Sequence, residues 1–195
     1  MAEPVNRLAI ALRYLWRFKI RNRHIKTRGM VHVARTARVY CRRGLATMEL
    51  GKDVWIGAGT NIRCHEGHMR IGDRVVVGGS NTINAYLDVD IGEDVIFADW
   101  IYVTDFDHRY QKTDVRIQDQ GIVKSPVRIA PDCWIGEKAS ILRGSTVGKG
   151  SVIGAQTLVK GAIPPYSVAV GSPATVKKRR GEKRRTPREG ATGQS

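Results

Sequence analysis

Cysteine is scarce in this sequence, and its spacing does not suit cross-linking. The 195 residues contain three cysteines, Cys41, Cys64 and Cys133, without a CxxC pair or any other paired spacing. This usage is typical of reducing compartments and not of secreted domains that depend on disulfides. We therefore expect a cytoplasmic protein.

Long hydrophobic runs are also missing. The early apolar stretch, residues 8–12, is ended by Arg13 and lacks a cleavage-type sequence after it. A membrane-spanning helix needs about 20 consecutive apolar residues. The sequence therefore predicts neither a membrane span nor a signal peptide.

Acidic residues are nearly absent from the two ends of the chain. Residues 1–43 contain 12 Lys and Arg against one acidic residue, and residues 177–195 contain eight against two. The body between them is close to neutral, so the formal net charge of +15 resides in the ends. Such ends could meet nucleic acid, an anionic membrane or anionic substrates. No nucleic-acid-binding motif accompanies them, and we expect no nucleic-acid partner.

What the sequence does contain is a six-residue repeat. Aliphatic residues recur at every sixth position, and most of the residues directly after them and two positions before them are small. The repeated aliphatic positions are Ile129, Ile135, Ile141, Val147, Ile153 and Val159. A period of six fits neither an amphipathic helix nor a two-sided strand. It predicts an all-β solenoid of short parallel strands around an aliphatic core.

The repeat also predicts how the chain is divided. Looser hexapeptides begin near Leu50 and reset near residues 64–70 and 84–90, so we assign residues 29–176 to the solenoid, with 29–48 as an irregular first coil. Some twenty residues without a hexapeptide, within residues 104–126, predict a protruding functional loop. Residues 177–195 are expected to form a basic tail that is disordered from about residue 180.

The N-terminal segment, residues 1–28, predicts a basic amphipathic helix over residues 5–26. Leu8, Leu12, Leu15 and Trp16 share one stripe, with arginines elsewhere around the helix. Two roles remain open for it. It could lie on an anionic membrane surface, which would place the protein on the inner face of the membrane. It could equally cover the open end of the solenoid or pack on a neighbouring subunit.

The end of the repeat array is as informative as the repeat itself. Residues 163–174 read Ile-Pro-Pro-Tyr-Ser-Val-Ala-Val-Gly-Ser-Pro-Ala, with a Pro-Pro pair and a Gly-x-Pro-Ala motif. Together with the hexapeptides this ending resembles the left-handed β-helix hexapeptide acyltransferases, particularly the sugar O-acetyltransferases of the maltose, galactoside, nodulation-factor and exopolysaccharide type. The resemblance covers about residues 45–178.

The resemblance carries an expected activity. It implies a homotrimeric, CoA-dependent O-acyltransferase that moves an acyl group, with acetyl expected, from acyl-CoA directly to a hydroxyl of a sugar or glycoconjugate. The expected setting is polysaccharide biosynthesis. Acetyl-CoA or another acyl-CoA is then the co-substrate, and no metal is required.

His108 is the residue on which this expected chemistry depends. It resembles the His of the family's Asp-His loop motif, which acts as the general base toward the acceptor hydroxyl, a task that suits a pKa near neutrality. The Glu that often orients this His late in the loop has no counterpart here, which leaves Asp105 and Asp107 as candidates. Asn84 and Asp88 stand where the family places polar groups that hold the acceptor.

The resemblance also assigns residues to the donor. Backbone groups near Gly136, Glu137 and Ala155 would bind the pantetheine arm of CoA. Basic side chains would neutralise its phosphates. At one position where the family usually has a basic residue this sequence has Thr175, so the neighbouring lysines would make that contact. These basic residues are Lys160, Lys177 and Lys178, with Arg179 beside them.

Three other interpretations concern the histidines, Cys133 and the basic ends. Some left-handed β-helices bind zinc through three histidines, but the spacing of His65, His68 and His108 places the close pair first and does not fit that site. A thioester-forming Cys133 is disfavoured because its position in the repeat is predicted to point inward. A non-catalytic trimeric scaffold whose basic ends bind anionic surfaces is the alternative to the enzyme.

Overall fold

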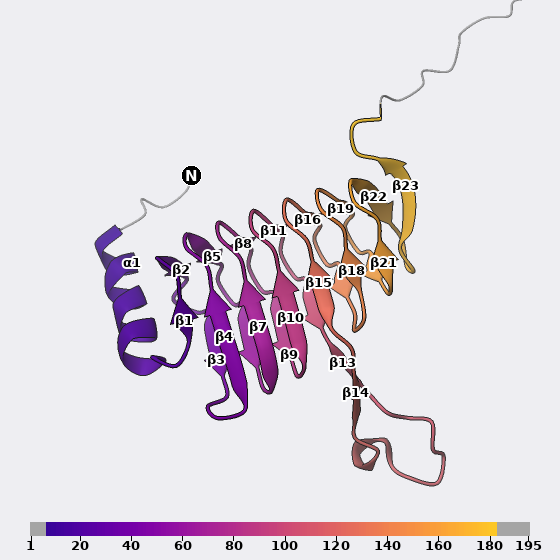
Figure 1. The fold of residues 1–195 in the computed structure, drawn as a ribbon, viewed down its shortest axis with the longest axis horizontal. Coiled ribbons are helices and arrows are strands. Elements are labelled where there is room, and N and C mark those ends of the chain that lie inside the picture. The colour runs from indigo at the N-terminus through magenta and orange to yellow at the C-terminus, as the bar shows by residue number, and fades with distance from the viewer. Residues whose placement is uncertain (1–6, 183–195) are drawn as a thin grey trace, which may run out of the picture.

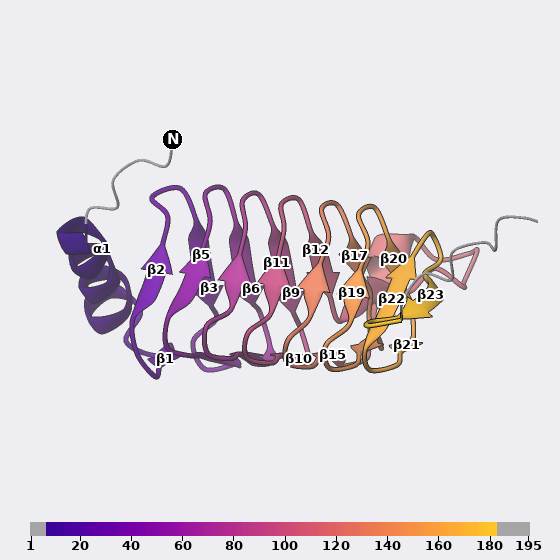
Figure 2. The same cartoon turned by 90° about the horizontal axis from the view of Figure 1, so that it is seen from above.

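The body of the protein is a parallel β-solenoid with three sheets along its axis, as Figures 1 and 2 show. The structure is a computed structural model and describes residues 7–182. Up to β22, successive strands of a sheet come from successive coils, and β23 then pairs antiparallel with β22. The fold is the parallel β-solenoid that the hexapeptides predict.

We name the sheets A, B and C in the order in which the chain visits them. Sheet A contains β1 (Lys26–Thr27), β4 (Ala46–Leu50), β7 (Gly67–Ile71), β10 (Asp88–Ile91), β15 (Val127–Ile129), β18 (Thr146–Val147) and β21 (Ala162–Ile163). Sheet B contains β2 (Val31–Val33), β5 (Val54–Ile56), β8 (Val76–Val77), β11 (Ile96–Phe97), β16 (Trp134–Ile135), β19 (Val152–Ile153), β22 (Ser167–Val170) and β23 (Thr175–Arg179). Sheet C contains β3 (Arg38–Cys41), β6 (Asn61–Cys64), β9 (Thr82–Ala85), β12 (Tyr102–Thr104), β17 (Ser140–Ile141) and β20 (Leu158–Val159).

The core consists of columns of aliphatic side chains that run along the axis. All six aliphatic residues of the regular repeat are buried, and Ile129 and Val147 are direct partners in neighbouring strands of sheet A. Because side chains alternate across a strand, each buried residue is flanked by an outward-facing one, as in the buried-exposed-buried pattern of β5. The hexapeptides therefore predicted the core, including the buried Cys133.

Corners between the sheets require small residues and unusual backbone conformations. A Cβ on Gly136 would lie 2.7 Å from the backbone nitrogen of Ala155 in the next coil, so only glycine fits there. Turns that follow sheet A repeatedly place an Asp in the left-handed region, with φ of 57° at Asp53 and 59° at Asp94 and Asp132. Asp tolerates this region better than most side chains.

The first coil and the last strand differ from the expectation. The solenoid already begins at β1, and residues 29–48 continue it through β2, β3 and part of β4, because Ile25, Val31 and Val33 fill the core. Residues 177–179, the start of the predicted basic tail, belong to β23, which pairs antiparallel with β22. Arg180 is also held, by Asp132 at 2.8 Å. The rest of the tail, residues 183–195, lies outside the described residues.

The N-terminal helix is shorter than predicted and changes its form. Helix α1 (Arg7–Tyr14) continues as a π-helical segment, η1 (Leu15–Arg21), which the backbone N–H of Asn22 ends by bonding to the Arg17 carbonyl at 2.9 Å. Tyr14 and Phe18 are its buried residues, whereas the predicted stripe of Leu8, Leu12, Leu15 and Trp16 is exposed. The helix lies across the open end of the solenoid (Figures 1 and 2).

The irregular segments of the repeat all emerge at one place. We call the corner where sheet C leads into sheet A the loop corner; its connections are residues 42–45, 65–66, 86–87, 105–126, 142–145 and 160–161. The longest connection contains an antiparallel hairpin of β13 (Phe106–His108) and β14 (Ile122–Lys124) and a short 3-10 turn, η2 (Ile117–Asp119). Figure 1 shows this hairpin protruding from the body.

Candidate active site at the loop corner

The protruding hairpin carries His108. In the ladder of β13 and β14, Asp107 pairs with Val123 and His108 pairs with Ile122, and the next residue, Arg109, bonds to the Gly121 carbonyl at 3.0 Å. The His108 side chain is exposed, and its ring meets the edge of Phe106 at a centroid distance of 6.3 Å. An accessible imidazole thus sits on a backbone that the hairpin fixes.

Asp105 anchors the base of this hairpin. Its side chain is fully buried, and its carboxylate accepts hydrogen bonds from the backbone N–H groups of Tyr86, Leu87 and Asp88 at 2.7–2.8 Å. Hydrogen bonds to a charged acceptor are among the stronger ones in proteins. Both carboxylate oxygens are occupied in this way, and the structure does not bring Asp105 onto His108.

Asp107 likewise binds elsewhere. Its carboxylate pairs with the Arg143 guanidinium at 2.6 Å, and Arg143 belongs to the following coil. Successive side chains of a strand point to opposite faces, so Asp107 and His108 diverge. Among residues 7–182, no carboxylate is hydrogen-bonded to the His108 imidazole. The predicted orienting acids therefore hold the hairpin and do not contact the histidine.

Asn84 and Asp88 lie at the same corner. Asn84 is 8% exposed, pairs with Thr104 in the ladder of β9 and β12, and accepts a hydrogen bond from Arg63 Nε at 3.0 Å. Asp88 forms an ion pair with Arg128, which also donates to the Asp88 carbonyl at 3.2 Å. The structure therefore brings both predicted acceptor residues to the foot of the hairpin.

A row of rings that sequence reasoning missed runs along the loop corner to His108. Neighbouring ring centroids lie 4.5–6.3 Å apart, and the imidazole of His65 stacks on Tyr86 at 4.7 Å. We call this the aromatic row: Tyr40, His65, Tyr86, Phe106 and His108. The first four of these residues are 20–25 positions apart, one in each successive coil, so only a coil-by-coil alignment would reveal them.

Charged side chains flank the aromatic row. Burial lowers the pKa of His65, and the positive charges of Arg63 and Arg42 lower it further. Lys124 lies 5.8 Å from the Tyr86 ring centroid and forms an ion pair with Glu66, and this contact lowers the pKa of the Glu66 carboxyl. The corner is thus basic, polar and partly aromatic.

The predicted donor residues occupy three different places. Gly136, Glu137 and Ala155 lie together where sheet B leads into sheet C. Lys160 is exposed at the loop corner, two coils beyond the hairpin, whereas Lys177 and Lys178 lie on β23 at the end of sheet B. A single copy of the chain therefore does not gather them into one cavity.

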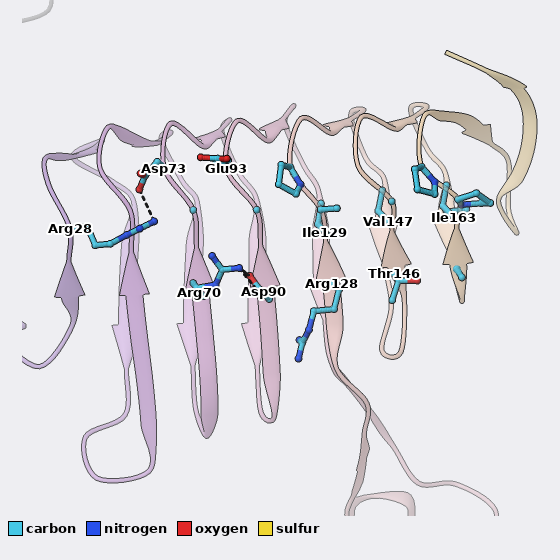
Figure 3. Close-up of a pocket in the computed structure, with 18 residues that line it drawn as sticks. Arg28, Arg70, Asp73, Asp90, Glu93, Arg128, Ile129, Thr146, Val147 and Ile163 are labelled. Atoms are coloured by element: carbon cyan, nitrogen blue, oxygen red, sulfur yellow. Dashed lines mark hydrogen bonds and ion pairs between the residues drawn. The ribbon is translucent and has the colours of Figure 1, made fainter. Parts of the chain in front are cut away.

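A shallow groove on sheet A is separate from His108. It has a volume of about 790 Å³, and Figure 3 shows its lining, which includes Arg28, Arg70 and Arg128. Arg28 pairs with Asp73 at 2.8 Å and Arg70 with Asp90 at 2.5 Å, so the charges of the groove are largely compensated. The pair of Arg128 with Asp88 connects the groove to the loop corner.

The histidines and cysteines of the described residues are mostly engaged in packing and hydrogen bonds. Across residues 7–182, no group of three or more His, Cys, Asp or Glu could hold a metal ion. His65 belongs to the aromatic row, whereas His68 bonds to the Thr47 hydroxyl at 2.6 Å. All three cysteines are free and buried, and burial raises the pKa of the Cys64 thiol to about 12 and that of Cys133 above its usual range. In the same range, no helix combines the length and hydropathy needed to cross a bilayer.

Comparison with known sequences points to acetyltransferases. No protein-family model matches the chain. The probable acetyltransferase Rv3034c of Mycobacterium tuberculosis is 54% identical over 166 residues, which make up 85% of this chain and 55% of that protein. The chain thus spans about half the length of this relative. WbbJ of Escherichia coli, whose name assigns it to lipopolysaccharide biosynthesis as an O-acetyl transferase, is 28% identical over 141 residues, or 68% of this chain and 72% of that protein.

Solved structures show the same fold. AntD, an N-acyltransferase from Bacillus cereus in complex with dTDP and 3-hydroxybutyryl-CoA, superposes with a TM-score of 0.70 at 16% identity and covers 83% of this chain and 87% of its own. Galactoside acetyltransferase in complex with coenzyme A has a TM-score of 0.54 at 24% identity, over 80% of this chain and 64% of its own. This chain has the left-handed β-helix of the hexapeptide-repeat acyltransferases and resembles that family in sequence as well as in fold.

Proposed function

We propose that the protein is an acyl-CoA-dependent O-acyltransferase that acylates a hydroxyl of a sugar or glycoconjugate, with acetyl as the expected acyl group. The observation that carries the proposal is the hairpin, which holds an exposed His108 above the corner where Asn84 and Asp88 lie. Similarity to proteins named acetyltransferases supports acyl transfer, and the dTDP in the AntD complex supports a sugar-related acceptor.

In the proposed mechanism His108 is the general base. Its neutral imidazole takes the proton of the acceptor hydroxyl while the hydroxyl oxygen attacks the thioester carbonyl of acyl-CoA. The tetrahedral intermediate then collapses, the carbon–sulfur bond breaks, and the imidazolium returns its proton to the leaving CoA thiolate. Direct transfer is supported by the cysteines, since all three are buried and their thiol pKa values are raised.

We propose that the anchoring of the hairpin backbone, and not a carboxylate partner, orients the side chain of His108. Asp105 fixes the start of the hairpin to residues 86–88, and Asp107 ties it to the next coil through Arg143. A general base must stay within hydrogen-bond reach of its proton donor. The two anchors restrict the motion of the hairpin backbone and so keep His108 in place. Asn84 and Asp88 are then proposed to hold the acceptor.

The donor site is proposed to be completed by neighbouring copies in a homotrimer. Gly136, Glu137 and Ala155 would line the pantetheine arm, and Lys160, Lys177 and Lys178 would meet the phosphates of CoA. Their separation within one copy supports a site shared between copies. An apolar column on the outer face of sheet B supports assembly, because its side chains are in register and 40–53% exposed. The column consists of Trp55, Val76, Ile96 and Trp134.

The test measures CoA release from acetyl-CoA with a panel of sugars and glycoconjugates. Removing a general base costs about 10²- to 10⁴-fold in turnover, so His108→Ala should lose activity by that factor. Lys112→Ala, an exposed change on the same loop, is the matched control and should retain wild-type turnover. Unchanged turnover in His108→Ala would refute the role of His108.

A non-catalytic trimeric scaffold is the second candidate, and it is favoured by the observation that no carboxylate of residues 7–182 is hydrogen-bonded to His108. Thermal unfolding with increasing CoA separates the two candidates, because a ligand that binds only the folded state raises stability as its concentration passes Kd. The enzyme predicts an upward shift. A melting temperature that stays constant up to millimolar CoA would support the scaffold.

We also propose a cytoplasmic protein that makes peripheral contact with the inner face of the membrane. The scarcity of cysteine pairs and the basic N-terminal region support this location. The acceptor would then be a glycan attached to a membrane lipid.

A further inference from the structure

Two arginines and two buried aromatic residues attach the N-terminal helix to the solenoid. Arg13 donates to the Val33 carbonyl at 2.9 Å, and Arg17 donates to the carbonyls of Ala37 at 2.7 Å and Arg35 at 3.0 Å. These carbonyls belong to the first coil, which has no further coil on that side. Tyr14 and Phe18 complete the contact from the buried side of the helix. The helix therefore caps the solenoid partly through arginines.

The opposite side of the helix is apolar and exposed. Its large side chains are spaced by four, three, one and four residues, which keeps them on one face of a helix. They are 48–69% exposed. We call them the outer stripe: Leu8, Leu12, Leu15, Trp16 and Ile20. A helix that served only as a cap would turn its leucines toward the core, so the outer stripe calls for an apolar phase outside the molecule.

The surroundings of the outer stripe decide which phase this is. Residues 7–43 contain no acidic residue, and Lys19, Arg21 and Arg23 are exposed beside the stripe. The Arg21 guanidinium lies 5.3 Å from the ring centroid of Trp16. Two copies that met through this end would bring mainly positive charges together, whereas an anionic surface would be attracted. The charge therefore favours a lipid surface over a second copy.

We propose that the outer stripe inserts into the headgroup layer of an anionic membrane, with the surrounding arginines and lysines on the lipid phosphates. Trp16 suits the interface because an indole ring is apolar over most of its surface and polar at one edge. The helix runs across the end of the solenoid in Figures 1 and 2, so the solenoid axis would point away from the membrane. This deepens the membrane location proposed above and does not depend on the chemistry at His108.

Co-sedimentation of the full chain with vesicles tests the proposal. Wild type should bind phosphatidylglycerol-containing vesicles and bind pure phosphatidylcholine weakly, and binding should fall as salt increases. The variant Leu12→Glu/Trp16→Glu should bind anionic vesicles at least about tenfold more weakly, because two apolar anchors become anionic. Ile117→Glu, a change at a similarly exposed apolar residue on the hairpin, should bind like wild type. The basic C-terminal tail is the same in all three proteins.

Each other outcome has a definite meaning. Equal binding by wild type and the double variant, or equal binding to neutral and anionic vesicles, would overturn the proposal. If the wild type binds no vesicle and the double variant has a smaller mass in sedimentation, a second copy covers the outer stripe. A matching melting temperature shows that the variant folds, and an unchanged response to CoA separates a failure of this inference from a failure of the proposed enzyme.

Discussion

Removing the Asp105 carboxylate should loosen the hairpin that carries His108. In Asp105→Ala, three backbone N–H groups at residues 86–88 lose their acceptor inside a buried site. A hydrogen bond to a charged group contributes about 1.5–3 kcal/mol. Because the three bonds share one carboxylate and water can enter the vacated space, their losses will not add fully. We expect a decrease of about 3–5 kcal/mol in the free energy of unfolding.

The location of the damage is as informative as its size. Urea unfolding gives the change in free energy, and amide hydrogen exchange at Tyr86, Leu87 and Asp88 reports whether those N–H groups have lost protection. Turnover should fall too, since the base of the hairpin is released while His108 itself is retained. Asp105→Asn keeps one carbonyl oxygen and should lie between wild type and Asp105→Ala.

A second aspartate provides the matched control. Asp99 also accepts a backbone N–H, from Gly79 at 2.6 Å, but makes a single such bond at an exposed corner without a hairpin. Asp99→Ala should cost about 1 kcal/mol and leave turnover unchanged. If Asp105→Ala stayed within about 1 kcal/mol of wild type with amides 86–88 still protected, the assignment of Asp105 as the anchor would be refuted.

Two further predictions concern the outer face of sheet B and the aromatic row. Trp134→Asp should convert the proposed trimer to monomers in sedimentation velocity, because it places a charge in the apolar column. Tyr102→Asp on sheet C is the control, and an intact trimer in Trp134→Asp would show that another surface makes the contact. The lowered pKa of His65 means that the folded state binds a proton less readily than the unfolded state, so the stability it contributes is present above the unfolded pKa of about 6.5 and is lost as pH falls. Wild type should therefore lose more melting temperature between pH 7 and pH 5 than His65→Phe, and equal losses would contradict this linkage.

The core could be predicted from the sequence because burial in a solenoid repeats with the period of the chain. Each inward aliphatic residue has a counterpart in the neighbouring coil, so position in the hexapeptide was enough to place Ile135 or Val159 inside. The orientation of the helix could not be predicted in this way. It has apolar residues on two sides, and periodicity cannot tell that Tyr14 and Phe18 face the solenoid while Leu12 faces outward.

The site could be predicted only in part, for a related reason. His108 could be proposed from the sequence because its loop interrupts the repeat and resembles the Asp-His loop of the family. The partners of Asp105 and Asp107 depend on which turn lies beside the hairpin base, and that neighbour is set by the stacking of coils and not by local sequence. The aromatic row was missed because the residues that touch are separated by a full coil.

The stacking of coils fixes the distance between the helix-capped end of the solenoid and the hairpin. Four strands of sheet A precede the hairpin, and parallel strands repeat about every 4.8 Å, so the hairpin leaves the body on the order of 20 Å from the helix-capped end. Insertion or removal of one complete coil would change that height by a single step without altering either the helix or the hairpin. The number of coils on the helix side of the hairpin therefore sets a distance that evolution can change without altering the residues of the candidate active site. For an enzyme whose capped end lies on a membrane, this distance would set how far from the membrane surface an acceptor hydroxyl must extend to meet His108.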